Sequence, residues 1–103
     1  MRRGGFMGGG GNAQMQQMMK QAQDMQKQLD KVKEELAETA IEATSGGGMV
    51  TVDISGAYEL LNLKIKPEAV DPDDVEMLED LVIAAINEAL NQVTKLREEK
   101  LPM

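Results

Sequence analysis

The feature that most constrains this chain is an apolar seam with heptad spacing. Apolar side chains recur at alternating steps of three and four residues, at Met15, Met18, Ala22, Met25, Leu29, Val32 and Leu36. This spacing keeps one stripe of an α-helix apolar and is typical of a helix that packs lengthwise on a partner. The sequence therefore predicts a helix from an N-cap at Asn12 to about Glu38, with a seam that needs a partner surface.

The positions that flank the seam carry little charge. A strict two-stranded coiled coil commonly sets its partner with charged residues there, whereas half of the flanking residues here are glutamine: Met19, Gln21, Gln26, Gln28, Lys33 and Glu35. The seam is therefore expected to be closed by a C-terminal helix, as one arm of a dimer, rather than to form a free-standing coiled coil.

The middle of the chain predicts a three-stranded antiparallel meander. Residues 39–45, 49–55 and 58–66 show β-branched or alternating apolar patterns, and glycine-containing turns join them. Leu60 breaks the alternation of the third strand, which indicates a β-bulge there or burial on both faces. Tyr58 is expected to pack in the sheet.

The last third of the chain predicts a second long helix. Pro67 ends the sheet and opens a short helical turn, and Asp71 with Pro72 reads as the cap and first position of a helix that runs to about Lys100. The segment 81–90 is apolar nearly all round, so it should be buried on more than one face. The residues predicted for the core and the dimer contact are Met77, Leu78, Leu81, Val82, Ala85, Ile86, Ala89 and Leu90.

These elements define an α+β fold: a long N-terminal helix, the meander, a short helical turn and a long C-terminal helix. A chain of 103 residues buries only a modest core, and pairing of two copies is a common remedy. The prediction is a homodimer with projecting helical arms. Its parts are a flexible glycine-rich leader (1–11), one domain (12–100) and a short tail (101–103).

Charge is distributed unevenly along the chain. The net charge of −7 argues against nucleic acid, but residues 1–33 hold six basic and only two acidic side chains, whereas residues 34–103 hold five basic and sixteen acidic ones. Binding to a polyanion depends on the local field. With one Phe and one Tyr for stacking, phosphate contact to duplex DNA is favoured over base recognition. The candidate contacts are Arg2, Arg3, Lys20, Lys27, Lys31, Lys33, Lys95, Arg97 and Lys100.

If the two long helices lie antiparallel, the start of the first meets the end of the last. That arrangement would gather Arg2, Arg3 and Lys20 near Lys95, Arg97 and Lys100. From the residues alone, an equally good interpretation is that these side chains only keep a helix soluble.

The sequence contains no candidate catalytic site and no candidate metal site. The chain has no cysteine and no histidine, which removes the commonest nucleophile, general base and zinc ligands. The acids of DPDDVE fail as a calcium loop, since the sixth position is Glu76 rather than glycine and the twelfth is Val82 rather than glutamate. No enzyme activity, cofactor, metal or small-molecule substrate is expected. Without an apolar run of membrane-spanning length or a signal peptide, a cytoplasmic location is expected.

Several stretches together resemble the YbaB/EbfC family of nucleoid-associated proteins. They are KQAQDMQ (20–26) in the methionine- and glutamine-rich helix, MVTVDISGAYELLNLKI (49–65) and MLEDLV (77–82). The resemblance implies a homodimer with paired, tweezer-like arms. It implies binding to duplex DNA with weak or variable sequence preference, a role in nucleoid organisation or gene regulation, and no enzymatic activity. The chain departs from the family pattern in its acidic net charge and in the short tail after Lys100.

A different class of function stays open beside DNA binding. Two long helices with strands between them also resemble prefoldin-like chaperone subunits, although the meander fits that pattern less well. In this alternative the chain is a structural or adaptor protein whose helices hold a protein partner.

Overall fold

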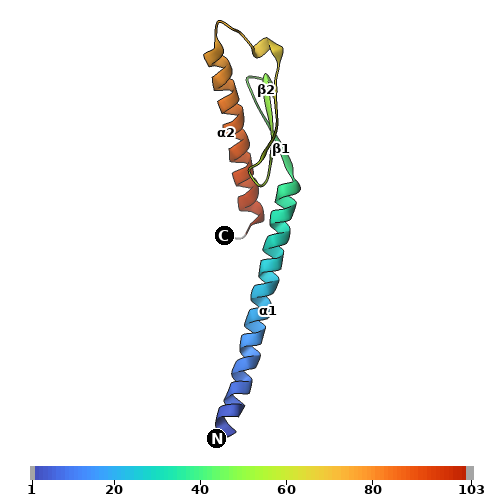
Figure 1. Cartoon of the computed structure of the whole chain (residues 1–103), viewed down its shortest axis with the longest axis vertical. Helices are drawn as coiled ribbons and strands as arrows, with labels where there is room; N and C mark the ends of the chain where they lie inside the picture. Colours follow the sequence, from blue (N-terminus) through green and yellow to red (C-terminus); the bar gives the residue numbers. More distant parts are fainter. Residues whose placement is uncertain (1, 102–103) are drawn as a thin grey trace. The chain divides into compact units, whose positions relative to one another are not determined.

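A computed structural model describes the backbone of residues 2–101 and the side chains of residues 12–101. The element order is a helix, three strands, a 3₁₀ turn and a helix, which confirms the predicted α+β fold (Figure 1). The chain divides into two compact units, residues 1–31 and residues 32–103. Among the described residues, neither helix has an apolar stretch long enough to cross a membrane.

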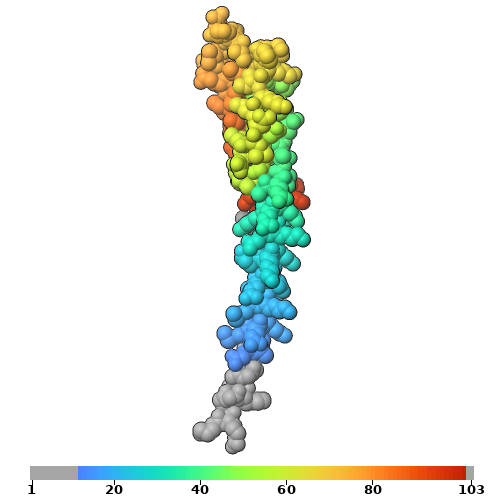
Figure 2. All heavy atoms as spheres, turned by 45° about the vertical axis from the view of Figure 1, so that its right-hand side comes forward, coloured from blue at the N-terminus to red at the C-terminus, as the bar shows by residue number. Residues whose placement is uncertain are grey.

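Helix α1 spans Arg2–Glu38, so it begins before the N-cap that the sequence predicted at Asn12. The described side chains of its first unit, residues 12–31, are all exposed except for half-buried Leu29. Figure 2 shows the side chains of this part of the helix on the face in view. Met18 is 68% exposed, whereas Leu36 at the other end of the seam is 1% exposed. Closure of the seam by a C-terminal helix in a dimer stays a prediction.

The three strands form one antiparallel sheet in the order β1-β2-β3, with bounds β1 Ala40–Ser45, β2 Val50–Ser55 and β3 Leu60–Ile65. The predicted meander is confirmed. Asp53 pairs with Asn62 and Ile54 pairs with Leu60, so Leu61 is the extra residue of a bulge. The glycines of the first turn adopt the left-handed backbone that only glycine takes at little cost.

The connection after the sheet follows the prediction except at the start of the last helix. The 3₁₀ turn η1 covers Pro67–Ala69, and helix α2 covers Val75–Lys100. The cap of α2 is Asp74, whose carboxylate accepts from the Met77 amide at 3.2 Å. The Asp71 carboxylate instead accepts from the Asp73 amide at 2.9 Å. The prediction of an Asp71 cap is therefore wrong, because that side chain closes a turn ahead of the helix.

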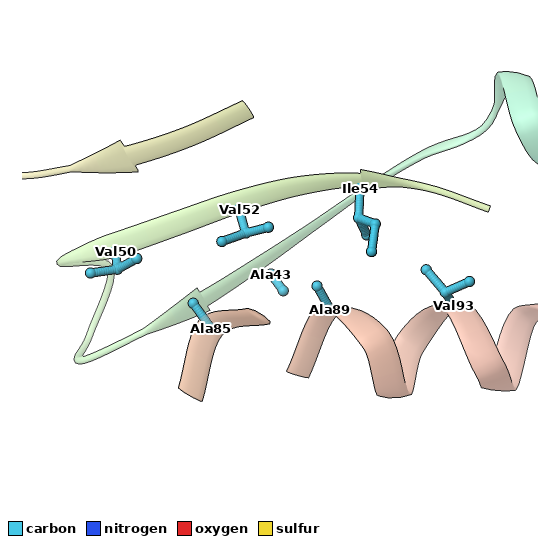
Figure 3. Packing of buried hydrophobic residues seen from close by; sticks show 7 residues of the cluster. All are labelled: Ala43, Val50, Val52, Ile54, Ala85, Ala89 and Val93. Carbon is cyan, nitrogen blue, oxygen red and sulfur yellow. The ribbon is translucent and has the colours of Figure 1, made fainter. Parts of the chain in front are cut away.

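The core of the second unit lies between α2 and strands β1 and β2 (Figure 3). Ala85, Ala89 and Val93 form one stripe at four-residue spacing, and the small alanines let the helix approach the sheet closely. Val93 was absent from the predicted core, although its spacing from Ala89 indicates it. The buried cluster consists of Ala43, Val50, Val52, Ile54, Ala85, Ala89 and Val93.

The remaining predicted core residues differ in their exposure. Leu81, Val82 and Ile86 are partly buried against the cluster. Leu78 is half-buried. Met77 and Leu90 are exposed. Some of the residues predicted for the core and the dimer contact are thus exposed to solvent in the single chain.

Candidate nucleic-acid interface

Three lysines of the first unit lie along one face of α1. Lys27 and Lys31 follow Lys20 by seven and eleven residues. At roughly 100° per residue, the three fall within an arc of about 40° and span about 16 Å of helix. All three are exposed. We call Lys20, Lys27 and Lys31 the lysine stripe. Of the predicted DNA contacts, these three are aligned along one face of a helix.

The apolar seam lies on the opposite face of the same helix. At roughly 100° per residue, Met18, Ala22 and Leu29 point about 160 to 200° away from Lys20. A partner helix along the seam would therefore leave the lysine stripe free. The residue spacing in the sequence already indicates that the lysines and the seam lie on opposite faces of the helix.

Lys33 does not belong to the lysine stripe. At roughly 100° per residue it points about 140° away from Lys20, beside the seam, and it lies in the second unit. Acidic residues Glu34, Glu35 and Glu38 follow it on α1. The basic face of α1 thus ends near Lys31. The side chains of Arg2 and Arg3 lie outside the described residues.

The other predicted contacts lie in the last turns of α2. Lys95 and Lys100 are exposed, and Glu98 and Glu99 lie between them in sequence. This segment therefore carries little net positive charge. Its predicted grouping with Arg2, Arg3 and Lys20 into one surface stays a prediction.

Arg97 is engaged with the rest of the second unit. Its Nη1 donates a hydrogen bond to the carbonyl oxygen of Gly56 at 2.9 Å. Its guanidinium carbon lies 5.4 Å from the centre of the Tyr58 ring, within cation–π range. These contacts could not be predicted from the sequence, because 41 residues separate Arg97 from Gly56.

Tyr58 does not pack in the sheet, so that expectation is wrong. It lies in the turn between β2 and β3 and is 45% exposed. Its φ of 64° is left-handed, as often happens at the last position of a three-residue hairpin loop. Its hydroxyl lies 2.8 Å from the Thr94 hydroxyl of α2. The ring thus packs on the end of a helix instead of on a strand.

A second uncovered surface runs along the edge strand β3. Helix α2 packs mainly on β1 and β2, which leaves the apolar side chains of β3 open. Leu60 is 53% exposed, and Ile83 on α2 is 56% exposed. Two hollows of about 240 and 390 Å³ lie between these elements. We call this surface the open face; it consists of Leu60, Leu61, Leu63, Ile65, Ile83 and Ile86.

Metal chemistry has no candidate site in the described part of the chain. Among those residues, no three acidic side chains gather closely enough to hold a metal ion. The acids of DPDDVE serve the turn and the helix cap described above.

Comparison with known proteins agrees with the resemblance. Residues 10–102 match the YbaB/EbfC DNA-binding family. A protein of Acetivibrio thermocellus named "Nucleoid-associated protein" is 51% identical over 96 residues, covering 93% of this chain and 83% of the relative. A protein of the same name from Chloroflexus aurantiacus is 52% identical over 85 residues, covering 82% and 85%.

The fold also matches a solved structure. The crystal structure of an uncharacterized protein from Helicobacter pylori superposes with a TM-score of 0.73 at 28% identity, covering 81% of this chain and 87% of that one. Together with the family match over nearly the whole length, these likenesses lead to one conclusion: this chain belongs to the YbaB/EbfC DNA-binding family.

Proposed function

We propose that the chain is a nucleoid-associated protein that binds duplex DNA as a homodimer through phosphate contacts. The observation that carries the proposal is the lysine stripe: three exposed lysines along about 16 Å of one helical face. That length is about half a turn of B-DNA, so the stripe can neutralise several phosphates. The names of the relatives and of the family support DNA as the ligand.

We expect weak sequence preference because the proposed contacts are made by lysine side chains. Lysine contacts phosphate as a point charge, and contacts to phosphate carry no sequence information. Tyr58, the only aromatic residue whose side chain is described, already packs against Arg97 and Thr94. We therefore expect the contacts to organise DNA in the nucleoid rather than to select one site. No catalytic residue or cofactor is proposed.

The homodimer is proposed to form through the open face. An apolar strand edge beside an apolar helix face is unfavourable in water and is the kind of patch that partner subunits cover. A second copy could bury the same residues from the other side, as a two-fold interface requires.

Charge removal at matched positions tests the DNA interface. Affinity for a short duplex would be measured across a salt series for wild type, for Lys27→Gln/Lys31→Gln and for the control Lys64→Gln/Lys66→Gln. Loss of two phosphate contacts should make the negative slope of log affinity against log salt shallower by about 1.8 per chain. The control removes the same charge from the end of the sheet and should leave the slope unchanged. Equal losses in both variants would contradict the stripe as the interface.

The exposed methionines favour a second candidate, a holdase-like adaptor. Met15, Met18, Met19 and Met25 are all exposed on α1, and methionine surfaces adapt to varied partners. Suppression of the aggregation of an unfolded client, measured by light scattering, together with no DNA shift at low salt, would favour this function over DNA binding.

A further inference from the structure

We propose that Arg97 is a positioning residue that braces the base of α1, and not a phosphate contact. The proposal builds on the DNA-binding function above, because α1 carries the lysine stripe. It assigns to Arg97 a role different from that of the lysines with which the sequence grouped it.

The contacts of Arg97 occupy one donor group and one face of its guanidinium. One edge of the guanidinium donates to the Gly56 carbonyl at 2.9 Å, and one face covers the Tyr58 ring at 5.4 Å. A guanidinium binds phosphate best with a free edge that donates two parallel hydrogen bonds. Half-buried and already bonded, Arg97 is poorly suited to that task.

The loop that Arg97 holds has an unfavourable backbone. Residues 56–59 join β2 to β3, and Tyr58 takes a left-handed φ of 64° at a position where glycine is usual. For a residue other than glycine this conformation is costly and persists where surrounding contacts enforce it. Here the enforcing contacts are Arg97 over the ring and the Tyr58 hydroxyl against Thr94.

The same loop touches the last turn of α1. The Gly56 amide donates to the Thr39 carbonyl at 3.0 Å. A Cβ atom on Gly56 would collide with the Leu36 carbonyl oxygen, so the two backbones are in close contact. Thr39 in turn bonds to α1 through its amide to the Leu36 carbonyl at 3.1 Å and its hydroxyl to the Glu35 carbonyl at 2.7 Å.

These contacts form one path from α2 to α1. Arg97 donates a hydrogen bond to Gly56, and Gly56 donates one to Thr39. Thr39 in turn donates to carbonyl oxygens in the last turn of α1. Lys31 lies just over one turn of helix before Leu36, on the same continuous helix. Loosening Arg97 should therefore fray the base of the helix that bears the DNA contacts, without removing a phosphate contact.

Amide hydrogen exchange tests the brace without DNA. In Arg97→Lys, which keeps the charge, and in Arg97→Gln, the Gly56 and Thr39 amides should exchange on the order of tenfold faster, since a charge-assisted hydrogen bond is lost. Lys100→Gln is the control and should leave both amides unchanged. Wild-type exchange at both amides in Arg97→Lys would overturn the proposal.

A second variant keeps the test decisive if the arginine variants fold poorly. Tyr58→Asn tolerates the left-handed backbone but removes the ring and its hydroxyl. It should also speed exchange at Gly56, with the melting midpoint measured alongside. Unchanged exchange in a folded Tyr58→Asn protein would likewise overturn the brace.

DNA titration separates this proposal from the general function. A positioning role predicts that Arg97→Lys and Arg97→Gln weaken binding alike and leave the salt slope at the wild-type value. A phosphate contact predicts instead that lysine restores binding and that glutamine makes the slope shallower by about 0.9 per chain. Failure of wild type to bind DNA would defeat the proposed function, while the exchange result would still decide the brace.

Discussion

At the scale of single residues, Ser55 is the buried polar side chain on which the β2–β3 turn depends. It is 2% exposed, and its hydroxyl accepts from the amides of Ala57 at 3.1 Å and Glu59 at 3.2 Å. Ser55→Ala would leave two amides without this partner and should lower the free energy of unfolding by about 1–3 kcal/mol. Urea denaturation measures the change. Thr44→Ser, on an exposed strand position, should change it by less than about 0.5 kcal/mol; equal effects would contradict this role for Ser55.

The cap of α2 gives a second prediction at this scale. Asp74→Ala should lower the free energy of unfolding by about 1 kcal/mol, because the Met77 amide loses its acceptor. Asp73→Ala removes a neighbouring carboxylate that makes no cap bond and serves as the control in the same denaturation series. A larger loss in Asp73→Ala than in Asp74→Ala would be inconsistent with the cap.

These residues also mark where sequence reasoning stops. Asp71, Asp73 and Asp74 are chemically equivalent cap candidates, and only the path of the chain decides among them. Tyr58 was misplaced for the same reason: its residue type indicated strand packing, whereas it contacts Arg97 and Thr94, which lie far away in sequence. The phosphate contact predicted for Arg97 stays a prediction, and its contact with Gly56 also joins segments far apart in sequence.

At the scale of elements, periodicity was a reliable guide. The three strands and the end of α2 lie close to their predicted bounds, because alternation and the 3.6-residue period record which side of an element is buried. The break at Leu60 correctly indicated the bulge. The sequence could not show that β3 lies outside the cover of α2, since burial on its apolar side depends on the position of another element.

The lysine stripe gives a prediction that depends on helical phase alone. Gln26→Lys with Lys27→Gln keeps the net charge but turns one lysine by roughly 100° toward the seam. DNA affinity should fall. Gln16→Lys with Lys27→Gln also keeps the charge and returns the lysine to within about 40° of Lys20, so affinity should stay near the wild-type value. Gel-shift titrations of the two variants compare them directly, and equal affinities would show that the phase of the lysines is irrelevant.

At the scale of the whole molecule, the acidic net charge and the proposed DNA binding are compatible because the charges are segregated. Between residues 67 and 94 there are eight acids and no base, whereas the lysine stripe lies in the other unit. Repulsion between the acidic segment and phosphate falls off within about 10 Å at ordinary salt. Because binding depends on the local field, a basic stripe in one unit is compatible with an acidic segment in the other.

The proposed dimer would connect the open face with the strength of DNA binding. Leu63→Glu/Ile83→Glu places two charges on the open face and should yield monomers in analytical ultracentrifugation, because burying unpaired carboxylates is costly. Thr44→Glu, on an exposed position of β1 outside the open face, is the control and should stay dimeric. With one lysine stripe in place of two, the salt slope should become shallower, from about −5.4 to about −2.7. A monomer that keeps the full slope would place the phosphate contacts elsewhere, and a variant that remains dimeric would place the subunit contact outside the open face.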